Sequence, residues 1–412
     1  MFTNTILSTY GTEYYQKATH GEGFVRGFFN VIKAATTGTG SALQRMFITG
    51  VSPVTMDDVT SGFNIGTNIT TDPWFNDLVG FSEAELREML TYYKEQGVLM
   101  QTVDETIVMM KPNYDNYCFS EEKLAQCMFN SDMALYFMKS FVLHHVKPKE
   151  IVDPNIRTDF NKLAYLIRLD HGLGENFSVI KEIAEQGEIT TDIATHFSAL
   201  EMTDVRNFKS LLFYFGLLSI KGVDMVGRPI LHVPNLVVRE QLFSFLIQGY
   251  IKHDIFKIDM NRMTMLFENM AFRGDWKPLF NFIAEAIREQ SRIREYIEGE
   301  AHIKGFLLAY LGMYRYYQLY PEYELNKGFA DFLFKPSPSV PVMPPLTYLL
   351  EVKYAKAGAS EKEIRALADE AREQLLRYSQ DELVTEARAK GGLKLITIVW
   401  CSWELVLLEE VL

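Results

Sequence analysis

Apolar positions recur along most of this chain with the three-to-four-residue spacing of helices. In FSEAELREMLTYYKEQG (81–97) this spacing is framed by Ser82, by Glu85 three residues on, and by Gly97 at the end. A serine N-cap with glutamate at the third position, and glycine after the last turn, mark a helix with defined ends. Residues 100–295 continue with aromatic and methionine residues at the same spacing and predict a mainly helical region.

Two shorter stretches interrupt the helical pattern before residue 290. MFITGVSPV (46–54) predicts a short buried strand that ends in a turn, after a helix predicted in EGFVRGFFNVIKAA (22–35). GLLSIKGVDMVGRPILHVPN (216–235) predicts two short strands around a glycine-containing turn. A helix in front of such a hairpin suggests a winged-helix-like module.

The pattern changes after residue 296, where strand-like runs follow one another. A helix at about 298–318 leads to NKGFADFLF (326–334), a proline-rich loop, the strand YLLEVKYA, a charged helix at about 360–389 and the strand LKLITIVW. This order is α-β-β-α-β, and the proline-rich loop is expected to join antiparallel neighbours. We therefore predict an α/β and mostly-α multidomain chain with divisions at 1–100, 101–290 and 291–412.

Composition narrows the class of protein. The chain has 412 residues and a formal net charge of −12, which argues against a histone-like role but leaves room for a locally basic groove. The three cysteines, Cys118, Cys127 and Cys401, form no C-x-x-C, so a disulfide framework or a structural zinc site is not expected. Neither a signal peptide nor an apolar run of about 18 residues occurs, so we expect a cytoplasmic protein without a membrane span.

TYLLEVKYAK (347–356) places charged residues in a strand that is otherwise apolar. Glu351 and Lys353 are two apart and therefore point to the same face. Buried charges cost free energy unless they are paired or used. Two interpretations are open: an ion pair at the end of a strand, or part of a metal-dependent active site.

Residues elsewhere in the last 115 positions favour the active-site interpretation. Asp331 on the preceding strand and Glu351 could bind Mg²⁺ or Mn²⁺, because these hard cations prefer oxygen ligands. Glu300, in the helix before the sheet, could join them. Such a cation would stabilise charge on a phosphodiester and activate water. Lys353 could orient that water.

The helix that follows adds a polar face. Gln374 and Tyr378 are four residues apart, hence on one side of the helix, and could position a phosphate or a base. Arg365, Arg372 and Arg377 of the same helix are either phosphate contacts or ordinary solvated charges. Trp400, at the end of the last predicted strand, is expected to pack in the core rather than to stack on a base.

The pieces G-x-x-D (328–331), E-V-K (351–353) and Q-L-L-R-Y (374–378), in α-β-β-α-β order, resemble the PD-(D/E)XK nuclease superfamily in its branch with a Q-x-x-x-Y helix. The resemblance implies a magnesium-dependent nuclease with Asp331, Glu351 and Lys353 at its centre. It implies DNA as the partner, although the sequence does not separate DNA from RNA. One residue departs from the superfamily motif: Ala330, rather than proline, precedes Asp331. The acidic residue of the preceding helix is also open, because either Glu298 or Glu300 can take that role.

The first half resembles the AAA-ATPase-like part of a two-part bacterial family that is abundant in Bacteroidetes. The segment RMFITGVSPVTMDDVTSGFNIGTNIT (45–70) carries this resemblance, and it implies a sensor position at Thr49 or Ser52, where turn capping is an equal alternative. No G-x-x-x-x-G-K-[ST] occurs in the 412 residues, so ATP binding and hydrolysis are not expected. An incomplete α/β domain would expose strand edges and favour homo-oligomers. The rival function is a non-catalytic module that binds nucleic acid or protein.

Overall fold

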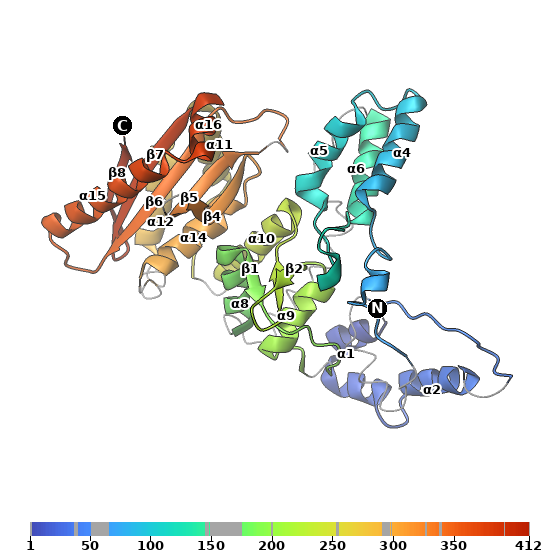
Figure 1. Cartoon of the computed structure of the whole chain (residues 1–412). Helices are drawn as coiled ribbons and strands as arrows, with labels where there is room; N and C mark the ends of the chain where they lie inside the picture. Colours follow the sequence, from blue (N-terminus) through green and yellow to red (C-terminus); the bar gives the residue numbers. More distant parts are fainter. Residues whose placement is uncertain are drawn as a thin grey trace. The chain divides into compact units, whose positions relative to one another are not determined.

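The computed structural model describes residues 2–36, 40–50, 66–144, 148, 175–198, 201–252, 255–290, 297, 299–325, 328–337, 340–390 and 392–411. These residues form two compact units (Figure 1). The first consists of residues 1–179 and 188–235, and the second of residues 180–187 and 236–412. The domain limits expected at residues 100 and 290 stay a prediction.

The N-terminal segment is helical where it is described. It contains α1 (Phe2–Thr19) and α2 (Phe24–Thr36). The strand predicted at 46–54 is wrong for residues 46–50, which are exposed and not in a strand, while residues 51–54 lie outside the described residues. Apolar β-branched residues favour a strand only where a neighbouring strand takes up the backbone hydrogen bonds. The described part of this segment contains no neighbouring strand. Where an α/β remnant was expected, the described residues therefore form helices and no strand.

The middle of the first unit consists of capped helices. These are α4 (Glu83–Glu95), α5 (Val103–Tyr114) and α6 (Ser131–His144), with short 3-10 turns η1 (Pro73–Phe75) and η2 (Glu121–Lys123). Ser82 and Glu85 form the predicted capping box, and Gly97 has a positive φ of 70° just after the helix. The predicted ends of this helix are confirmed, because they depend on local hydrogen bonds that the sequence specifies directly.

A small antiparallel sheet completes the first unit. Its strands are β1 (Glu188–Thr190), β2 (Ser219–Val223) and β3 (Pro229–His232), in the order β1-β3-β2. Helix α8 (Glu175–Gln186) precedes β1, and α9 (Val205–Tyr214) precedes β2. The predicted hairpin at 216–235 is therefore confirmed. The winged-helix-like assignment stays a prediction.

The second unit contains a five-stranded mixed sheet with helices on both of its faces. Its helices are α10 (Leu236–Lys252), α11 (Met260–Arg273), α12 (Lys277–Glu289), α14 (Glu300–Gly312), α15 (Glu361–Tyr378) and α16 (Glu382–Lys390). Its strands are β4 (Tyr317–Leu325), β5 (Gly328–Pro336), β6 (Thr347–Ala355), β7 (Leu393–Cys401) and β8 (Glu404–Val411), in sequential spatial order. Only β6 and β7 are parallel, and α15 with α16 supplies the connection that parallel neighbours need.

This topology corrects the expected α-β-β-α-β order in two respects. The helix expected at 298–318 ends at Gly312 and is followed by β4, and the chain ends with β8. Both missed strands are the edges of the sheet, where one side of the strand faces solvent and charged residues are tolerated. The acidic residues of ELVLLEEV therefore masked its strand character. The helix expected at 360–389 is two helices, α15 and α16.

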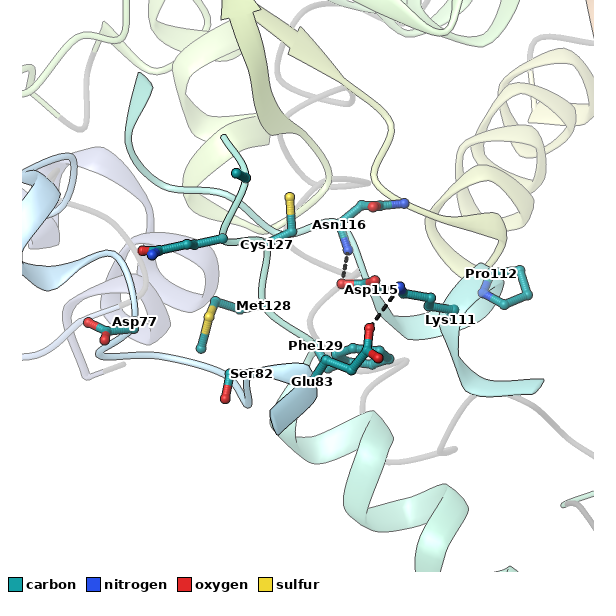
Figure 2. A pocket seen from close by; sticks show the side chains of 12 residues that line it. Asp77, Ser82, Glu83, Lys111, Pro112, Asp115, Asn116, Cys127, Met128 and Phe129 are labelled. Atoms are coloured by element: carbon teal, nitrogen blue, oxygen red, sulfur yellow. Dashed lines mark hydrogen bonds and ion pairs between the residues drawn. The ribbon is translucent and has the colours of Figure 1, made fainter. Parts of the chain in front are cut away.

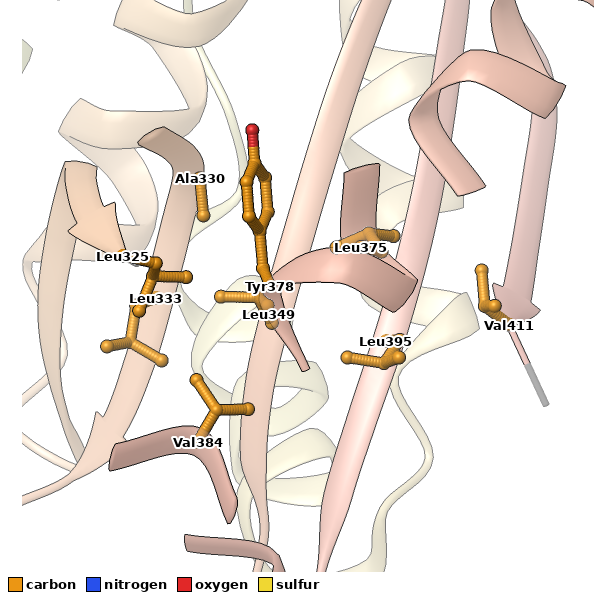
Figure 3. Close-up of a cluster of buried hydrophobic side chains, with 9 residues drawn as sticks. All are labelled: Leu325, Ala330, Leu333, Leu349, Leu375, Tyr378, Val384, Leu395 and Val411. Carbon is orange, nitrogen blue, oxygen red and sulfur yellow. The ribbon is translucent and has the colours of Figure 1, made fainter. Parts of the chain in front are cut away.

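The core of the second unit lies on both faces of β6. On one face, Leu349 packs with Leu375 and Tyr378 of α15 and with Val384 of α16 (Figure 3). On the other face, the Tyr348 hydroxyl donates to the Met270 carbonyl of α11 at 2.7 Å. The antiparallel pairing of β5 with β6 confirms the predicted role of the proline-rich loop. Trp400 is 1% exposed near the end of β7, which confirms the core packing expected for this side chain.

Candidate active site

Asp331 and Glu351 meet where the β5–β6 ladder ends. The pairing joins residues 332–334 to residues 350–348 in antiparallel register, so its continuation by one step places Asp331 opposite Glu351. The Val352 N–H donates to Asp331 Oδ2 at 2.6 Å, and the Asp331 N–H makes a long 3.5 Å contact to Glu351 Oε2. Both residues are buried, at 5% and 3% exposed. The sheet thus holds two carboxylates side by side, each fixed by the neighbouring strand.

Lys353 lies beside this acidic pair. Its Nζ is 3.3 Å from Glu351 Oε1, as expected for two residues on one face of β6. The same ammonium is 3.2 Å from Glu370 Oε1 of α15. The ion pair and the active-site interpretations are therefore not exclusive, because Lys353 is paired with Glu351, which is itself one of the two buried carboxylates.

Lys304 of α14 is a second lysine of the site, and sequence reasoning missed it. Its ammonium contacts Asp331 Oδ1, and it lies 2.9 Å from Glu300 Oε1 and 3.1 Å from Glu322 Oε1. Glu300 and Lys304 are four residues apart at the start of α14, and this spacing was the one available signal. The contact with Asp331 follows only from the packing of α14 beside the sheet.

Gln374 and Tyr378 face the site from α15. Glu370, Gln374 and Tyr378 are spaced by four and therefore lie along one side of the helix. Glu370 contacts Lys353. Burial raises the pKa of Tyr378, and the nearby Glu351 raises it further. This side of α15 therefore faces the acidic pair. The Oε1 of Gln374 is buried and accepts no hydrogen bond within the described part of the chain. A buried acceptor or donor group without a partner is a site where a ligand or water fits.

A glycine makes room for Tyr378. Gly328, at the start of β5, has a φ of +144°, and a Cβ placed on it would lie 2.9 Å from the Tyr378 hydroxyl oxygen. A larger residue would need both a strained backbone and a shift of this ring. The G-x-x-D spacing therefore has a physical reason in this chain: the glycine admits Tyr378, and the aspartate three residues later reaches Glu351.

The electrostatics of the site reflect an excess of carboxylates. Burial and the neighbouring Asp331 raise the pKa of Glu351 to about 8, although Lys353 opposes the shift. Burial also raises the pKa of Asp331, with Lys304 acting against it. For both lysines, burial favours the neutral form, but the adjacent carboxylates outweigh it and the pKa is raised. The two ammonium groups therefore do not neutralise the acidic groups around them.

The donors fit a hard divalent cation only in part. Asp331 and Glu351 offer adjacent carboxylate oxygens, and Mg²⁺ is commonly held by one or two carboxylates with water completing its shell. The described residues contain no group of three or more His, Cys, Asp or Glu side chains arranged for a metal. Lys304 contacts both Glu300 and Asp331, so an ammonium group already lies beside these carboxylates. Glu298, the alternative to Glu300, lies outside the described residues.

The remaining candidates contribute less. Arg365 is exposed and 3.7 Å from Glu409, and Arg377 lies over the Tyr378 ring, 5.6 Å from its centroid. A role of these arginines toward phosphate stays a prediction. Thr49 lies in the exposed, non-strand segment, and Ser52 lies outside the described residues. No helix in the described ranges has the length and apolar character that crossing a membrane requires.

Comparison with known families finds a match at each end of the chain. Residues 298–410 match the PD-(D/E)XK nuclease superfamily, and residues 1–60 match a family described as predicted AAA-ATPase. The first match spans the helix α14 and the whole five-stranded sheet that carries the acidic pair. The two-part arrangement expected from the motifs is thereby confirmed. Searches of curated proteins and of solved structures returned no match.

Proposed function

We propose that the C-terminal region is a magnesium-dependent nuclease that hydrolyses phosphodiester bonds in DNA. The match to the PD-(D/E)XK superfamily supports a nuclease at the level of the superfamily. The observation that carries the proposal further is the buried pair Asp331 and Glu351, held on adjacent strands with Lys353 3.3 Å from Glu351. Burying two carboxylates side by side is costly, and a divalent cation would offset that cost.

Each residue of the site has a role that its position supports. Asp331 and Glu351 would hold the cation, which supplies charge stabilisation at the phosphoryl group and lowers the pKa of a bound water. The Val352 N–H donates to Asp331 Oδ2 at 2.6 Å, and the Lys304 ammonium contacts Oδ1, so a cation bound through Oδ1 would compete with Lys304. Lys353 would orient the attacking water and stabilise developing negative charge, since its ammonium is anchored by Glu351 and Glu370.

The α15 side of the site would contact the substrate. Gln374 carries a buried Oε1 that accepts no hydrogen bond from the described residues, and its amide can donate to a phosphate oxygen or to a base edge. Tyr378 packs against β5 at Gly328 and so fixes the rotation of α15 about its axis. Glu300 would act through Lys304 in the absence of a cation, because its carboxylate is 2.9 Å from that ammonium.

The test is cleavage of linear duplex and single-stranded DNA with Mg²⁺ or Mn²⁺. We expect Asp331→Asn and Lys353→Met each to lower the rate by at least about 100-fold, in line with the loss of a charge that acts in the transition state. Lys335→Met is the matched control, because Lys335 is exposed on β5 and contacts no carboxylate of the site. Equal cleavage by wild type and Asp331→Asn would refute the catalytic assignment.

A non-catalytic binding module is the second candidate, and one observation favours it. The Lys304 ammonium is already inserted among Glu300, Glu322 and Asp331, so the chain supplies a cation of its own. In that case DNA would bind with equal affinity to wild type and Asp331→Asn, and no cleavage would accompany binding in Mg²⁺. Filter binding on the same DNA, measured beside the cleavage assay, separates the two functions.

For the N-terminal region we propose that these residues do not hydrolyse ATP. The match to predicted AAA-ATPases covers residues 1–60. The 412 residues contain no G-x-x-x-x-G-K-[ST]. They therefore lack the loop whose backbone amides and lysine bind the β- and γ-phosphates.

A further inference from the structure

Two cysteines of the first unit lie directly across from each other. Tyr117 and Met128 form an antiparallel bridge in which each N–H donates to the other's carbonyl, at 3.1 and 2.7 Å. The next position along the same register pairs Cys118 with Cys127. Because the bridge is a hydrogen-bonded pair, its neighbour is a non-hydrogen-bonded pair, in which the Cα atoms are typically about 4.5 Å apart. Disulfides span Cα separations of roughly 4.4–6.8 Å, a range that includes this typical separation.

The two side chains are close enough for each thiol to act on the pKa of the other. Cys118 is 1% exposed, and its Sγ also donates to the Ser120 carbonyl at 3.1 Å. The neighbouring Cys127 side chain favours the Cys118 thiolate and lowers the pKa of Cys118 to about 7, while the pKa of Cys127 is raised. One thiolate therefore forms near neutral pH with a protonated thiol beside it.

A pocket gives small molecules access to the pair. Cys127 is half-buried and lines a cavity of about 750 Å³ together with polar residues of the same unit (Figure 2). Asp115 and Lys111 of α5 and its C-cap line the same cavity and act on Cys127 electrostatically, the lysine favouring its thiolate and the aspartate opposing it. A hydrogen peroxide molecule in the pocket thus comes into contact with Cys127, which neighbours the buried Cys118.

We propose that Cys118 and Cys127 are a reversible redox pair whose oxidant is a small peroxide. A thiolate of the pair attacks one peroxide oxygen, so that an S–O bond forms, the O–O bond breaks and hydroxide leaves. The second thiol then attacks the sulfenic sulfur, and the S–O oxygen leaves as water with that thiol's proton. In sum, two thiols and one hydrogen peroxide give one disulfide and two waters. A dithiol reductant reverses the state by thiol–disulfide exchange.

The disulfide would fasten the two segments that form one wall of the pocket. It would close the short loop 118–127, which contains η2, and replace two neighbouring thiols by a fixed link. Sequence reasoning expected no disulfide because nine positions separate these cysteines and no C-x-x-C exists. The bridge at Tyr117 and Met128 is what places them opposite each other.

The experiment treats the full chain with one equivalent of hydrogen peroxide and then counts thiols in denaturant. The chain has three cysteines, and we expect the count to fall from three to one. Peptide mass spectrometry should find Cys118 linked to Cys127, with Cys401 still a thiol and the loss reversed by dithiothreitol. Cys401 is the internal control, since its register partner is Glu404 and its thiol donates to the Lys356 carbonyl.

Variants separate the pair from general thiol oxidation. Cys401→Ser should keep the two-thiol loss, and Cys127→Ser should abolish both the linked peptide and the two-thiol loss. Sulfinic acid at either position of the wild type in place of the link, or oxidation of Cys401 ahead of the pair, would overturn the proposal. The wild-type peptide analysis decides the question even if a serine variant folds poorly.

Discussion

Replacing Lys304 by methionine tests whether the carboxylates of the site are a cation site. The change removes the ammonium from among Glu300, Glu322 and Asp331 while keeping most of the apolar stem. Asp331 is 5% exposed, so its charge loses a partner that water cannot replace. Breaking a buried pair costs about 3–5 kcal/mol, and exposed pairs such as that with Glu322 contribute about 0–1 kcal/mol.

For Lys304→Met we expect the lower value of this range, about 3 kcal/mol. The Lys304 side chain is 18% exposed, so the pair is not fully buried, and the Val352 N–H still donates to Asp331 in the variant. This value is the expected loss in the free energy of unfolding of the second unit in chelator. Saturating Mg²⁺, at about 100 times its dissociation constant, would restore about 2.7 kcal/mol if it binds the folded state alone. The wild type should gain less, since Mg²⁺ must there compete with a resident ammonium.

The assay is urea unfolding followed by tryptophan fluorescence, with EDTA or with Mg²⁺. A Trp74→Phe background removes the tryptophan of the first unit, which is 88% exposed, and leaves three in the second. Lys394→Met is the matched control, because Lys394 binds both oxygens of Glu410 at 2.8 Å and has a similar exposure. If Mg²⁺ raises the free energy of unfolding of Lys304→Met and Lys394→Met equally, or of neither, the acidic cluster is not a cation site and the reasoning fails.

Three further outcomes follow from particular contacts. Gly328→Ala should lose about 1–3 kcal/mol of stability in urea unfolding, and Tyr378→Phe should recover part of it, since the hydroxyl is the atom that the new methyl meets. Burial and Lys221 lower the pKa of His232 below 6.5 in the folded protein. As the pH drops below 6.5, the imidazole is therefore protonated more readily in the unfolded chain, and the free energy of unfolding falls. His232→Gln should flatten that fall in hydrogen exchange of β1–β3, and an unchanged slope would contradict it. Phosphate release from ATP by the purified chain should not exceed that of a buffer blank.

The local features of the chain were readable from short sequence distances. The helix of Ser82 and Glu85, the hairpin at 216–235 and the β6 strand with Glu351 and Lys353 each depend on residues within a few positions of one another. Capping boxes, turns and the two-residue alternation of a strand act over that range. The edge strands β4 and β8 escaped prediction because pairing, rather than composition, makes them strands.

Long-range contacts were not readable in the same way. The sequence by itself determined that Asp331, Glu351 and Lys353 lie on strands and that Gln374 and Tyr378 share a helix face, because local periodicity fixes those positions. Only the tertiary structure decided that Lys304 enters the acidic cluster and that Cys118 meets Cys127. Those contacts arise from how α14 packs beside the sheet and how one bridge sets a register. Packing and register depend on the shape of many side chains at once, so no single motif encodes them.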